Sequence, residues 1–357
     1  MGLVCITSDH HYDAYKQFST VLSTGVNSRL AEMLAVEDWL HEEMVRRSVN
    51  VHFRLGDLFD KKNTIDAVTY IEVASRIRKN VESGIREIIF VGNHDIAIGG
   101  IRNTLEDLEA STGATIVSSP VDLLIEDHVW RCIPHNENIT EMEQAFRFLS
   151  KMASMNLTHI LLSHVGVHGA RSGSEFVLPG YFSIDSLEWE RYRWTFLGHV
   201  HEPQFFNGTN VSYVGSFVQR NFSDVGSQRR AIFYKTDTEI PLSIPLPGPQ
   251  FVAVSFSSLD EVEQYVVDDN TYYKITIANH SIQPRIVNDR FCSSRGWTLT
   301  FIDSSAQRVP ERPQLKLTTW EDVCGSYITQ KSPDADRGRL LDAAKQCITQ
   351  SRSPLSE

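Results

Sequence analysis

Residues 85–100 read IREIIFVGNHDIAIGG. The apolar run that ends at Val91 predicts a buried strand. After one glycine, an amide, an imidazole and a carboxylate follow directly at Asn93, His94 and Asp95. A turn needs only one such side chain, so the others require a reason that the rest of the sequence must supply.

Up to about residue 165 the 357-residue chain alternates short apolar runs with amphipathic ones. This alternation is typical of a layered α/β domain, with strands buried under helices. The expected strands are 3–6, 49–55, 85–91, 159–163 and 193–197, and the expected helices are 29–47, 67–81 and 141–155.

The pattern changes after residue 205. Short strands with turn signals lead into a segment rich in proline, 238–250, which marks a domain boundary. Beyond it, apolar runs and one acidic helical run predict a small α+β module. We therefore expect three parts: a main domain at 1–238, an accessory module at 250–303, and a linker with a helical tail at 304–357.

Composition limits the classes of function. Hydrophobic residues make up 41% of the chain and charged residues 22%, which is ordinary for a globular protein. No apolar stretch approaches the roughly 20 residues of a membrane span, and the N-terminus lacks a secretion signal. The five cysteines are scattered and form no CxxC pair, which argues against disulfides and a cysteine zinc site and favours the cytoplasm. A net charge of −11 excludes unaided attraction to nucleic-acid phosphates, unless acidic residues hold divalent cations.

Polar side chains follow five of the expected strands. In open α/β sheets, ligands bind just beyond the carboxyl ends of the strands, so these side chains are expected at one edge. The five strand ends are SDHH (8–11), GDLFD (56–60), GNHD (92–95), SH (163–164) and GHVH (198–201).

Asp, Asn and His together suit divalent ions such as Mn²⁺, Fe²⁺ or Zn²⁺. Two ions about 3.5–4 Å apart stabilise both the attacking and the leaving oxygen in phosphoryl displacement. One such strand end alone is more often an ordinary hydrogen-bonding turn, but five in order favour a metal site. In the opening stretch, Asn93 would bind a metal through its carbonyl oxygen, His94 would face the substrate, and Asp95 would orient His94.

The order DxH, GDxxD, GNHD, lone His and GHxH resembles the calcineurin-like metallophosphoesterases over about residues 1–235. The resemblance implies an αββα sandwich and two metal sites that share one carboxylate. It also implies that His94 contacts the scissile phosphate and either stabilises charge or protonates the leaving oxygen. Within DxHH, His10 is an alternative ligand to His11, and the spacing favours His11. The implied ligands are Asp9, His11 and His201 for one metal, Asn93, His164 and His199 for the second, and Asp57 as the bridge.

Two further stretches resemble the SbcD-type nucleases of this superfamily. GDLFDKKN (56–63) is similar to their second motif, and YVGSFVQRNFSD (213–224) to the stretch after GHxH. The second match departs from the family at Phe217, where proline is usual, and at Ser223-Asp224, where Gly-Glu is usual. The resemblance, of phage or bacterial type, implies Mn²⁺-dependent cleavage of DNA, 3′ to 5′ from ends and endonucleolytic on single strands or hairpins. Such activity serves DNA repair, recombination and replication.

The tail predicts two amphipathic helices. One carries Trp320, Val323 and Tyr327 on one face, and the second carries Leu340 and Ile348. In the resembled family, paired tail helices dock on an SbcC-type, SMC-like ATPase, and two nuclease copies join it in a heterotetramer. The alternative is that the tail packs on its own domain.

Other surfaces of the chain also bear on its partners. Apolar positions within 65–77 are candidates for a homodimer contact or for the core. Candidate DNA contacts are the basic residues Lys61, Lys62, Arg171, Arg220 and Arg229, with a solvated surface as the alternative for each.

Other functions fit the same motifs less well. A stand-alone phosphodiesterase or phosphatase acting on nucleotides or small phosphoesters would use the same metals but would not need the tail. A scaffold without activity is disfavoured because no implied ligand has been lost. A phosphoprotein phosphatase is disfavoured because nothing after GHxH resembles that group.

Overall fold

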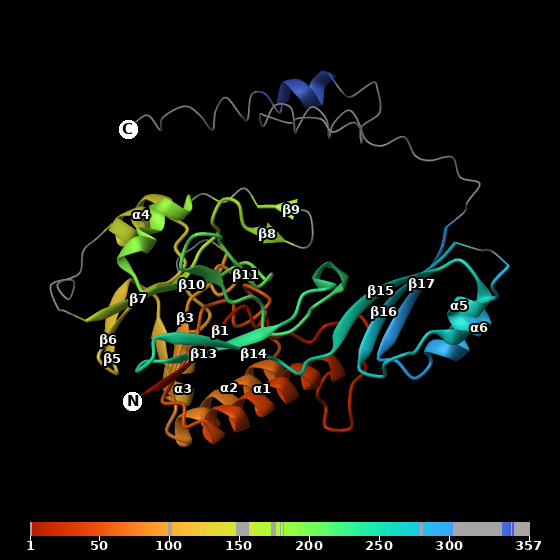
Figure 1. Ribbon diagram of the computed structural model, residues 1–357, viewed down its shortest axis with the longest axis horizontal. Coiled ribbons are helices and arrows are strands. Elements are labelled where there is room, and N and C mark those ends of the chain that lie inside the picture. Colours follow the sequence, from red (N-terminus) through yellow and green to blue (C-terminus); the bar gives the residue numbers. More distant parts are fainter. Residues whose placement is uncertain are drawn as a thin grey trace. The chain divides into compact units, whose positions relative to one another are not determined.

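The computed structural model describes residues 2–98, 102–147, 157–172, 176–178, 180, 182–278, 281–302, 338–343 and 345. The chain divides into two compact units, Met1–Ile302 and Asp303–Glu357. In the first unit, two six-stranded sheets pack together, with α1 to α3 on one side and α4 on the other (Figure 1).

The first sheet has the order β14-β13-β1-β2-β3-β4. Strands β1 to β4 run parallel, β13 pairs antiparallel with β1, and β14 pairs antiparallel with β13. The strands are β1 (Leu3–Thr7), β2 (Val51–Arg54), β3 (Arg86–Phe90), β4 (Thr115–Val117), β13 (Arg230–Lys235) and β14 (Ile240–Pro245). The covering helices are α1 (Ser28–Arg46), α2 (Ala67–Glu82) and α3 (Glu106–Thr112).

The second sheet has the order β11-β12-β10-β7-β6-β5, with β6, β7, β10 and β12 parallel. Its strands are β5 (Val121–Ile125), β6 (His128–Ile133), β7 (Thr158–His164), β10 (Trp194–Gly198), β11 (Gln204–Phe205) and β12 (Val211–Tyr213). Helix α4 (Ile139–Arg147) and the short helices Ile184–Leu187 and Trp189–Arg191 cover it, and β8 (Arg171–Ser172) pairs with β9 (Phe176–Val177) nearby in sequence.

Strand β1 shows why these strands read as unbroken apolar runs. Cys5 packs with the helices of the first layer, whereas Val4 and Ile6 pack between the two sheets. A strand buried on both faces needs apolar residues at every position. The side chains of α4 and of the second sheet's outer face form a third cluster. The expected α/β class and its layering are therefore confirmed.

The predicted helices over 29–47 and 67–81 are confirmed within one residue at each end, and side-chain oxygens of Asn27 and Asp66 cap their N-termini. The helix predicted over 141–155 is confirmed as far as Arg147, because 148–156 lie outside the described residues. The sequence pattern predicts no element within 102–133, where the structure has α3 and β4 to β6.

A third, all-parallel sheet follows the two large ones. Its strands β15 (Gln250–Phe256), β16 (Thr271–Ile277) and β17 (Gly296–Phe301) alternate with α5 (Leu259–Gln264) and α6 (Pro284–Phe291), and together they have their own apolar core. The hydroxyl of Tyr272 donates to Glu32 Oε1 at 2.7 Å, and the guanidinium of Arg29 lies 4.6 Å from the Tyr272 ring centre. The third sheet and the two large sheets thus belong to one compact unit.

In the second unit, residues 338–343 are helical and lie within the second predicted tail helix. The linker and the first predicted tail helix lie outside the described residues.

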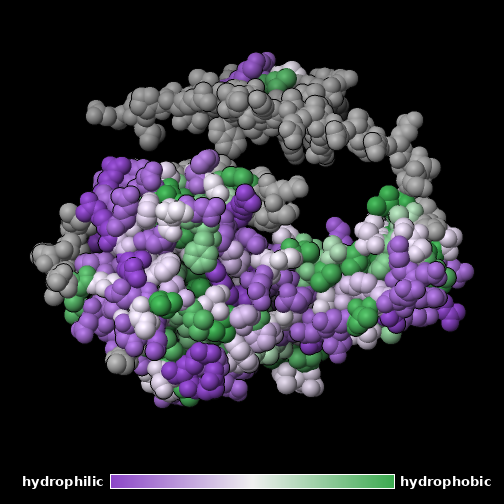
Figure 2. All heavy atoms as spheres, in the orientation of Figure 1, coloured by the Kyte–Doolittle hydropathy of each residue, from purple (hydrophilic) through white to green (hydrophobic). Residues whose placement is uncertain are grey.

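Among the described residues, no helix is long and apolar enough to cross a membrane. Hydrophilic residues are spread over the face shown in Figure 2. Cys5 and Cys132 are buried free thiols, and Cys292 is exposed.

A buried charge network underlies the first sheet. The Arg54 side chain is 1% exposed and pairs with Glu37 Oε1 at 2.5 Å and with Glu87 Oε2 at 2.8 Å. Burial opposes ionisation of Glu87, but the charges and hydrogen bonds of Arg54 and His52 together outweigh it and lower the pKa of Glu87 to about 2. His10 Nε2 lies 3.1 Å from Arg54 Nη1 and 3.1 Å from Thr7 Oγ1. The network therefore supports the end of β1.

We predict that Arg54→Met lowers the free energy of unfolding by about 3–5 kcal/mol at pH 7.5, because it leaves two carboxylates buried without a counter-charge. Urea unfolding measures this. In the wild type, the low pKa of Glu87 gives stability that is present above about pH 4.5 and lost as the pH falls towards 2. In the variant, the stranded carboxylates are protonated well above that range. The deficit should therefore shrink at pH 5.

The exposed arginine Arg46, paired with Glu43, supplies the control. Arg46→Met should leave the unfolding free energy close to that of the wild type, because an exposed ion pair contributes little. A deficit for Arg54→Met that stays constant between pH 7.5 and 5 would contradict this account of the network.

Candidate metal centre

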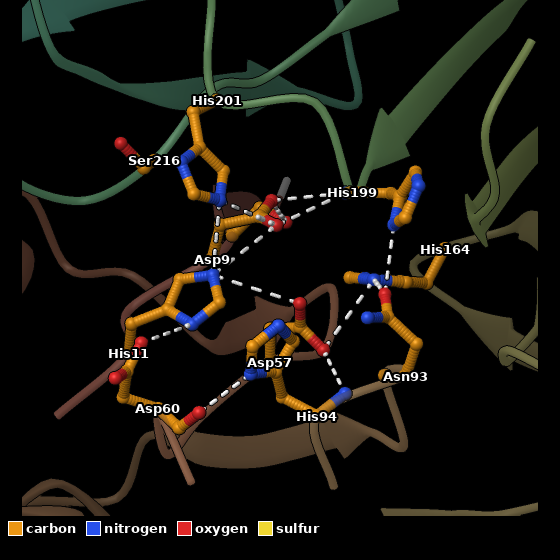
Figure 3. A network of polar contacts seen from close by, with 12 residues as sticks. Asp9, His11, Asp57, Asp60, Asn93, His94, His164, His199, His201 and Ser216 are labelled. Carbon is orange, nitrogen blue, oxygen red and sulfur yellow. Dashed lines mark hydrogen bonds and ion pairs between the residues drawn. The ribbon is translucent and has the colours of Figure 1, made fainter. Parts of the chain in front are cut away.

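The ends of five strands, three from the first sheet and two from the second, meet at one place (Figure 3). Strands β1, β2 and β3 supply one side of the cluster, and β7 and β10 supply the other. All predicted ligands lie within it: Asp9, His11, Asp57, Asn93, His164, His199 and His201. We name the group Asp9, His11 and His201 the first half-site, and Asn93, His164 and His199 the second half-site.

The backbone of this cluster is unusual. Asp9, His11, Asp57 and His199 all have positive φ, between 50° and 92°. Non-glycine residues adopt this region rarely, and such strain collects at functional sites. The local hydrogen bonds hold it: the His199 N–H donates to Asp9 Oδ2 at 3.0 Å.

Two of the glycines before the ligands are required by close approach. A Cβ on Gly92 would lie 2.3 Å from the backbone nitrogen of Asp57. A Cβ on Gly198 would lie 2.3 Å from Ser8 Oγ. Any side chain at either position would force the strand ends apart.

The first half-site brings two imidazoles together. His11 Nε2 lies 3.0 Å from His201 Nε2, and each of these nitrogens is 3.9 Å from Asp9 Oδ1. One ligand atom from each of these residues falls within 4.8 Å of the others. Such a grouping of imidazole nitrogens and a carboxylate suits a borderline divalent cation.

The second half-site contains the observation that tests the fit of a metal. His164 Nδ1 lies 2.6 Å from the backbone oxygen of Leu55, so this nitrogen carries the proton. In the neutral ring, the lone pair of Nε2 then faces Asn93 Oδ1 at 3.0 Å. Both atoms can then bind one cation, and an outer hydrogen bond of this kind is usual for metal-binding histidines. The residues therefore fit a metal ion.

Asp57 lies between the two half-sites (Figure 3). Its Oδ2 is 3.6 Å from His11 Nε2, and its Oδ1 is 3.5 Å from His164 Nε2. One carboxylate oxygen thus faces each half-site, as the bridging role implied by the sequence requires.

The electrostatics also favour a bound cation. Burial and the nearby Asp9 raise the pKa of Asp57 to about 7. Burial, followed by the charge of His164, lowers the pKa of His199 to about 4, and burial also lowers the pKa of His11 and His201. His11, His199 and His201 are therefore neutral near pH 7 and can act as ligands.

The expected role of Asp95 is corrected. His94 Nδ1 lies 2.5 Å from the backbone oxygen of Asp60, so Asp60 and not Asp95 orients the ring. The fully buried carboxylate of Asp95 instead accepts from the Leu58 N–H at 3.1 Å and the Gly92 N–H at 2.9 Å. Asp95 therefore joins the loops after β2 and β3.

The structure also distinguishes the two histidines of DxHH. His10 is buried against Thr7 and Arg54, whereas His11 faces the centre. Two residues proposed as DNA contacts are largely buried: Arg229 is 3% exposed, and Arg220 donates to Asp60 and to Tyr15.

Asp60, Tyr15 and Asp224 were given no role at the site from the sequence. Asp60 lies within GDLFD, and Asp224 lies within the motif-like stretch YVGSFVQRNFSD (213–224). Nothing in the local sequence around Tyr15 indicates a role at the centre.

The chain is similar in sequence to a known nuclease component. The chain is 24% identical over 261 residues to the SbcD component of the nuclease SbcCD from Staphylococcus epidermidis, a match that covers 64% of this chain and 69% of the relative. No family model matches the chain. One solved crystal structure aligns with 68% of this chain and 98% of its own at 9% identity, but its TM-score of 0.39 supports no conclusion.

We predict that metal-free Asp57→Asn is more stable than the metal-free wild type at pH 8. The raised pKa of Asp57 means that its contribution to stability is present below about pH 4 and is lost as the pH rises through about 7. Asparagine does not ionise, so the free energy of unfolding of the variant should be higher than that of the wild type by at least about 1 kcal/mol. Thermal unfolding in a chelator measures the difference.

In added Mn²⁺, the wild type should be more stable than Asp57→Asn. A cation at about 100 times its dissociation constant stabilises by about 2.7 kcal/mol per site, and Asp57→Asn should lose most of this gain. Asp260→Asn, at an exposed carboxylate of the third sheet's helix α5, should behave as the wild type. Equal Mn²⁺ stabilisation of wild type and Asp57→Asn would rule out a shared carboxylate.

Proposed function

We propose that this protein is a metal-dependent DNA nuclease that hydrolyses phosphodiesters with two divalent ions, preferably Mn²⁺. The observation that carries the proposal is the convergence of seven ligand side chains in two half-sites that share Asp57. The similarity to a protein named as part of a nuclease supports DNA as the substrate. The proposed activities are 3′ to 5′ exonuclease and single-strand or hairpin endonuclease.

Bound divalent ions would polarise the phosphate and activate the attacking water. The two half-sites would hold the ions, and Asp57 would fix their spacing. His94 belongs to a group with His11 and Asp57 whose ligand atoms lie within 4.8 Å of one another. Because its Nδ1 faces the Asp60 carbonyl, Nε2 is the nitrogen left for the substrate. From there a protonated His94 would give its proton to the leaving oxygen.

We further propose that the protein acts in an SbcCD-like DNA end-processing complex, in the cytoplasm of a bacterium or of a phage-infected host. The proposed partners are a second copy of the chain and an SbcC-type, SMC-like ATPase that binds the tail. Ile71 on α2 is 63% exposed and Val68 is 39% exposed, which supports a contact between two copies. On the tail helix, Leu340 is 42% exposed.

We predict that His94→Ala lowers Mn²⁺-dependent cleavage of end-labelled duplex and single-stranded DNA by about 10²–10⁴-fold, since it removes the proton donor. Mn²⁺ binding, followed by calorimetry, should persist. The matched control is His168→Ala, which removes an exposed histidine and should cleave as the wild type does. Cleavage by His94→Ala at the wild-type rate would exclude the assigned role.

A small aryl phosphodiester, run in the same assay, distinguishes the substrate class. A DNA nuclease should turn it over weakly compared with DNA. Rapid turnover of the ester with DNA left intact would favour a stand-alone phosphodiesterase, unless addition of an SbcC-type ATPase restored DNA cleavage.

We predict that Ile71→Glu converts a dimer of this chain to a monomer, because it places a charge in an apolar contact. Sedimentation equilibrium of the full chain measures the change. Val266→Glu, at a residue that is 83% exposed outside α2, is the control and should leave the dimer intact. A dimer that survives Ile71→Glu would move the contact away from α2.

A further inference from the structure

Residues 219–229, which follow β12 and precede β13, carry two arginines towards the first half-site. We name them the arginine loop. Arg229 is 3% exposed, and its Nη1 donates to the backbone oxygen of His201. The Ser216 N–H donates to the same oxygen at 3.0 Å. The main chain of this ligand is therefore held from two sides.

Asp224 joins the two ends of the arginine loop. Its Oδ1 lies 2.9 Å from Arg229 Nη2, and its Oδ2 accepts from the Arg220 N–H at 2.7 Å. The carboxylate is 6% exposed, so neither interaction is screened well by water. One carboxylate thus fixes both arginines.

Arg220 extends the loop to the other imidazole of the first half-site. Its Nη2 donates to Asp60 Oδ1, and its Nε donates to the Tyr15 hydroxyl at 3.1 Å. Asp60 Oδ1 in turn lies 3.4 Å from His11 Nδ1. The arginine loop therefore reaches His201 directly and His11 through one carboxylate.

The second half-site is held by different groups. His164 is fixed by the Leu55 carbonyl, and Asn93 Oδ1 lies 2.7 Å from His199 Nδ1. A change in the arginine loop should therefore act on one half-site more than on the other.

Arginines beside a cation site are electrostatically unfavourable unless each is neutralised. Asp224 neutralises Arg229, and Asp60 neutralises Arg220. A buried ion pair of this kind is a weak source of stability, because desolvation offsets most of the attraction. Because Arg229 of this pair also holds the backbone of His201, we infer that the pair positions that residue.

We propose that Arg229 and Asp224 are positioning residues that hold His201 against His11 and so set the affinity of the first half-site for its metal ion. The inference rests on the proposed two-metal function. It assigns the buried Arg229, a candidate DNA contact in the sequence, a role in metal affinity instead.

The test is calorimetric titration of the metal-free full chain with Mn²⁺, together with electron paramagnetic resonance of the paired ions. The wild type should bind two ions. Arg229→Gln and Asp224→Asn should weaken one binding event by about 10–100-fold, the usual effect of removing an outer partner of a ligand. They should leave the other event unchanged and abolish the paired-ion signal at two equivalents of Mn²⁺.

Arg230→Gln is the matched control. Arg230 is the adjacent arginine, and its Nη2 donates to the Tyr213 backbone oxygen at 2.7 Å, not to a ligand. This variant should bind both ions as the wild type does. Arg229→Lys keeps the buried charge and should recover part of the lost affinity, which guards against a variant that fails to fold.

The outcomes separate this inference from the proposed function. A wild type that binds no Mn²⁺ would overturn both. A wild type that binds two ions, with Arg229→Gln and Asp224→Asn indistinguishable from it, would overturn only the positioning role. Equal weakening of both events in Arg229→Gln, Asp224→Asn and Arg230→Gln would show a general structural effect and would also overturn it.

Discussion

The arrangement of the whole site depends on two carboxylates that are buried side by side. Asp9 and Asp57 are 0% and 2% exposed, and they follow parallel neighbours whose register pairs Thr7 with Arg54. Like charges in a medium of low dielectric constant repel strongly, so the pair is tolerated only if one is protonated or a cation binds. The surrounding imidazoles are kept neutral by burial and cannot supply that charge themselves. A divalent cation removes the conflict.

In the absence of a cation, the strained backbone at these strand ends has to be held in place by the sheet and by the residues packed beneath it. Four ligands have positive φ, and the strain has to be balanced by the structure around them. The sheet provides part of the support, because the ligand loops leave rigid parallel strands. Arg54 provides another part by holding His10, the residue between two ligands, within a network that also fixes Glu37 and Glu87. Burying these charges carries a desolvation penalty. The network in exchange fixes the conformation of the Asp9–His11 turn.

The gathering of these side chains could be predicted from sequence because the signal is local: each follows its own strand directly, and parallel strands end at one edge. Asp95 shows the limit. Its position beside His94 suggested that it orients that ring, but its carboxylate accepts from the Leu58 and Gly92 N–H groups instead. Strand β6 was missed because His128 and Arg131 interrupt its apolar pattern, although both are buried in the fold. Arg220 and Asp60 are 160 residues apart, and nothing in either segment identifies the other as its partner.

The arginine loop is under constraint from two sides. At one end Gln219 Oε1 accepts from the Phe251 N–H at 2.5 Å, and the Phe222 ring meets the Phe251 ring edge-on with centres 5.0 Å apart. At the other end, Arg229 holds His201. Residues 219–229 therefore link the third sheet to the first half-site through one short segment. The position of the small sheet and the geometry of the first half-site are therefore not independent properties of this chain.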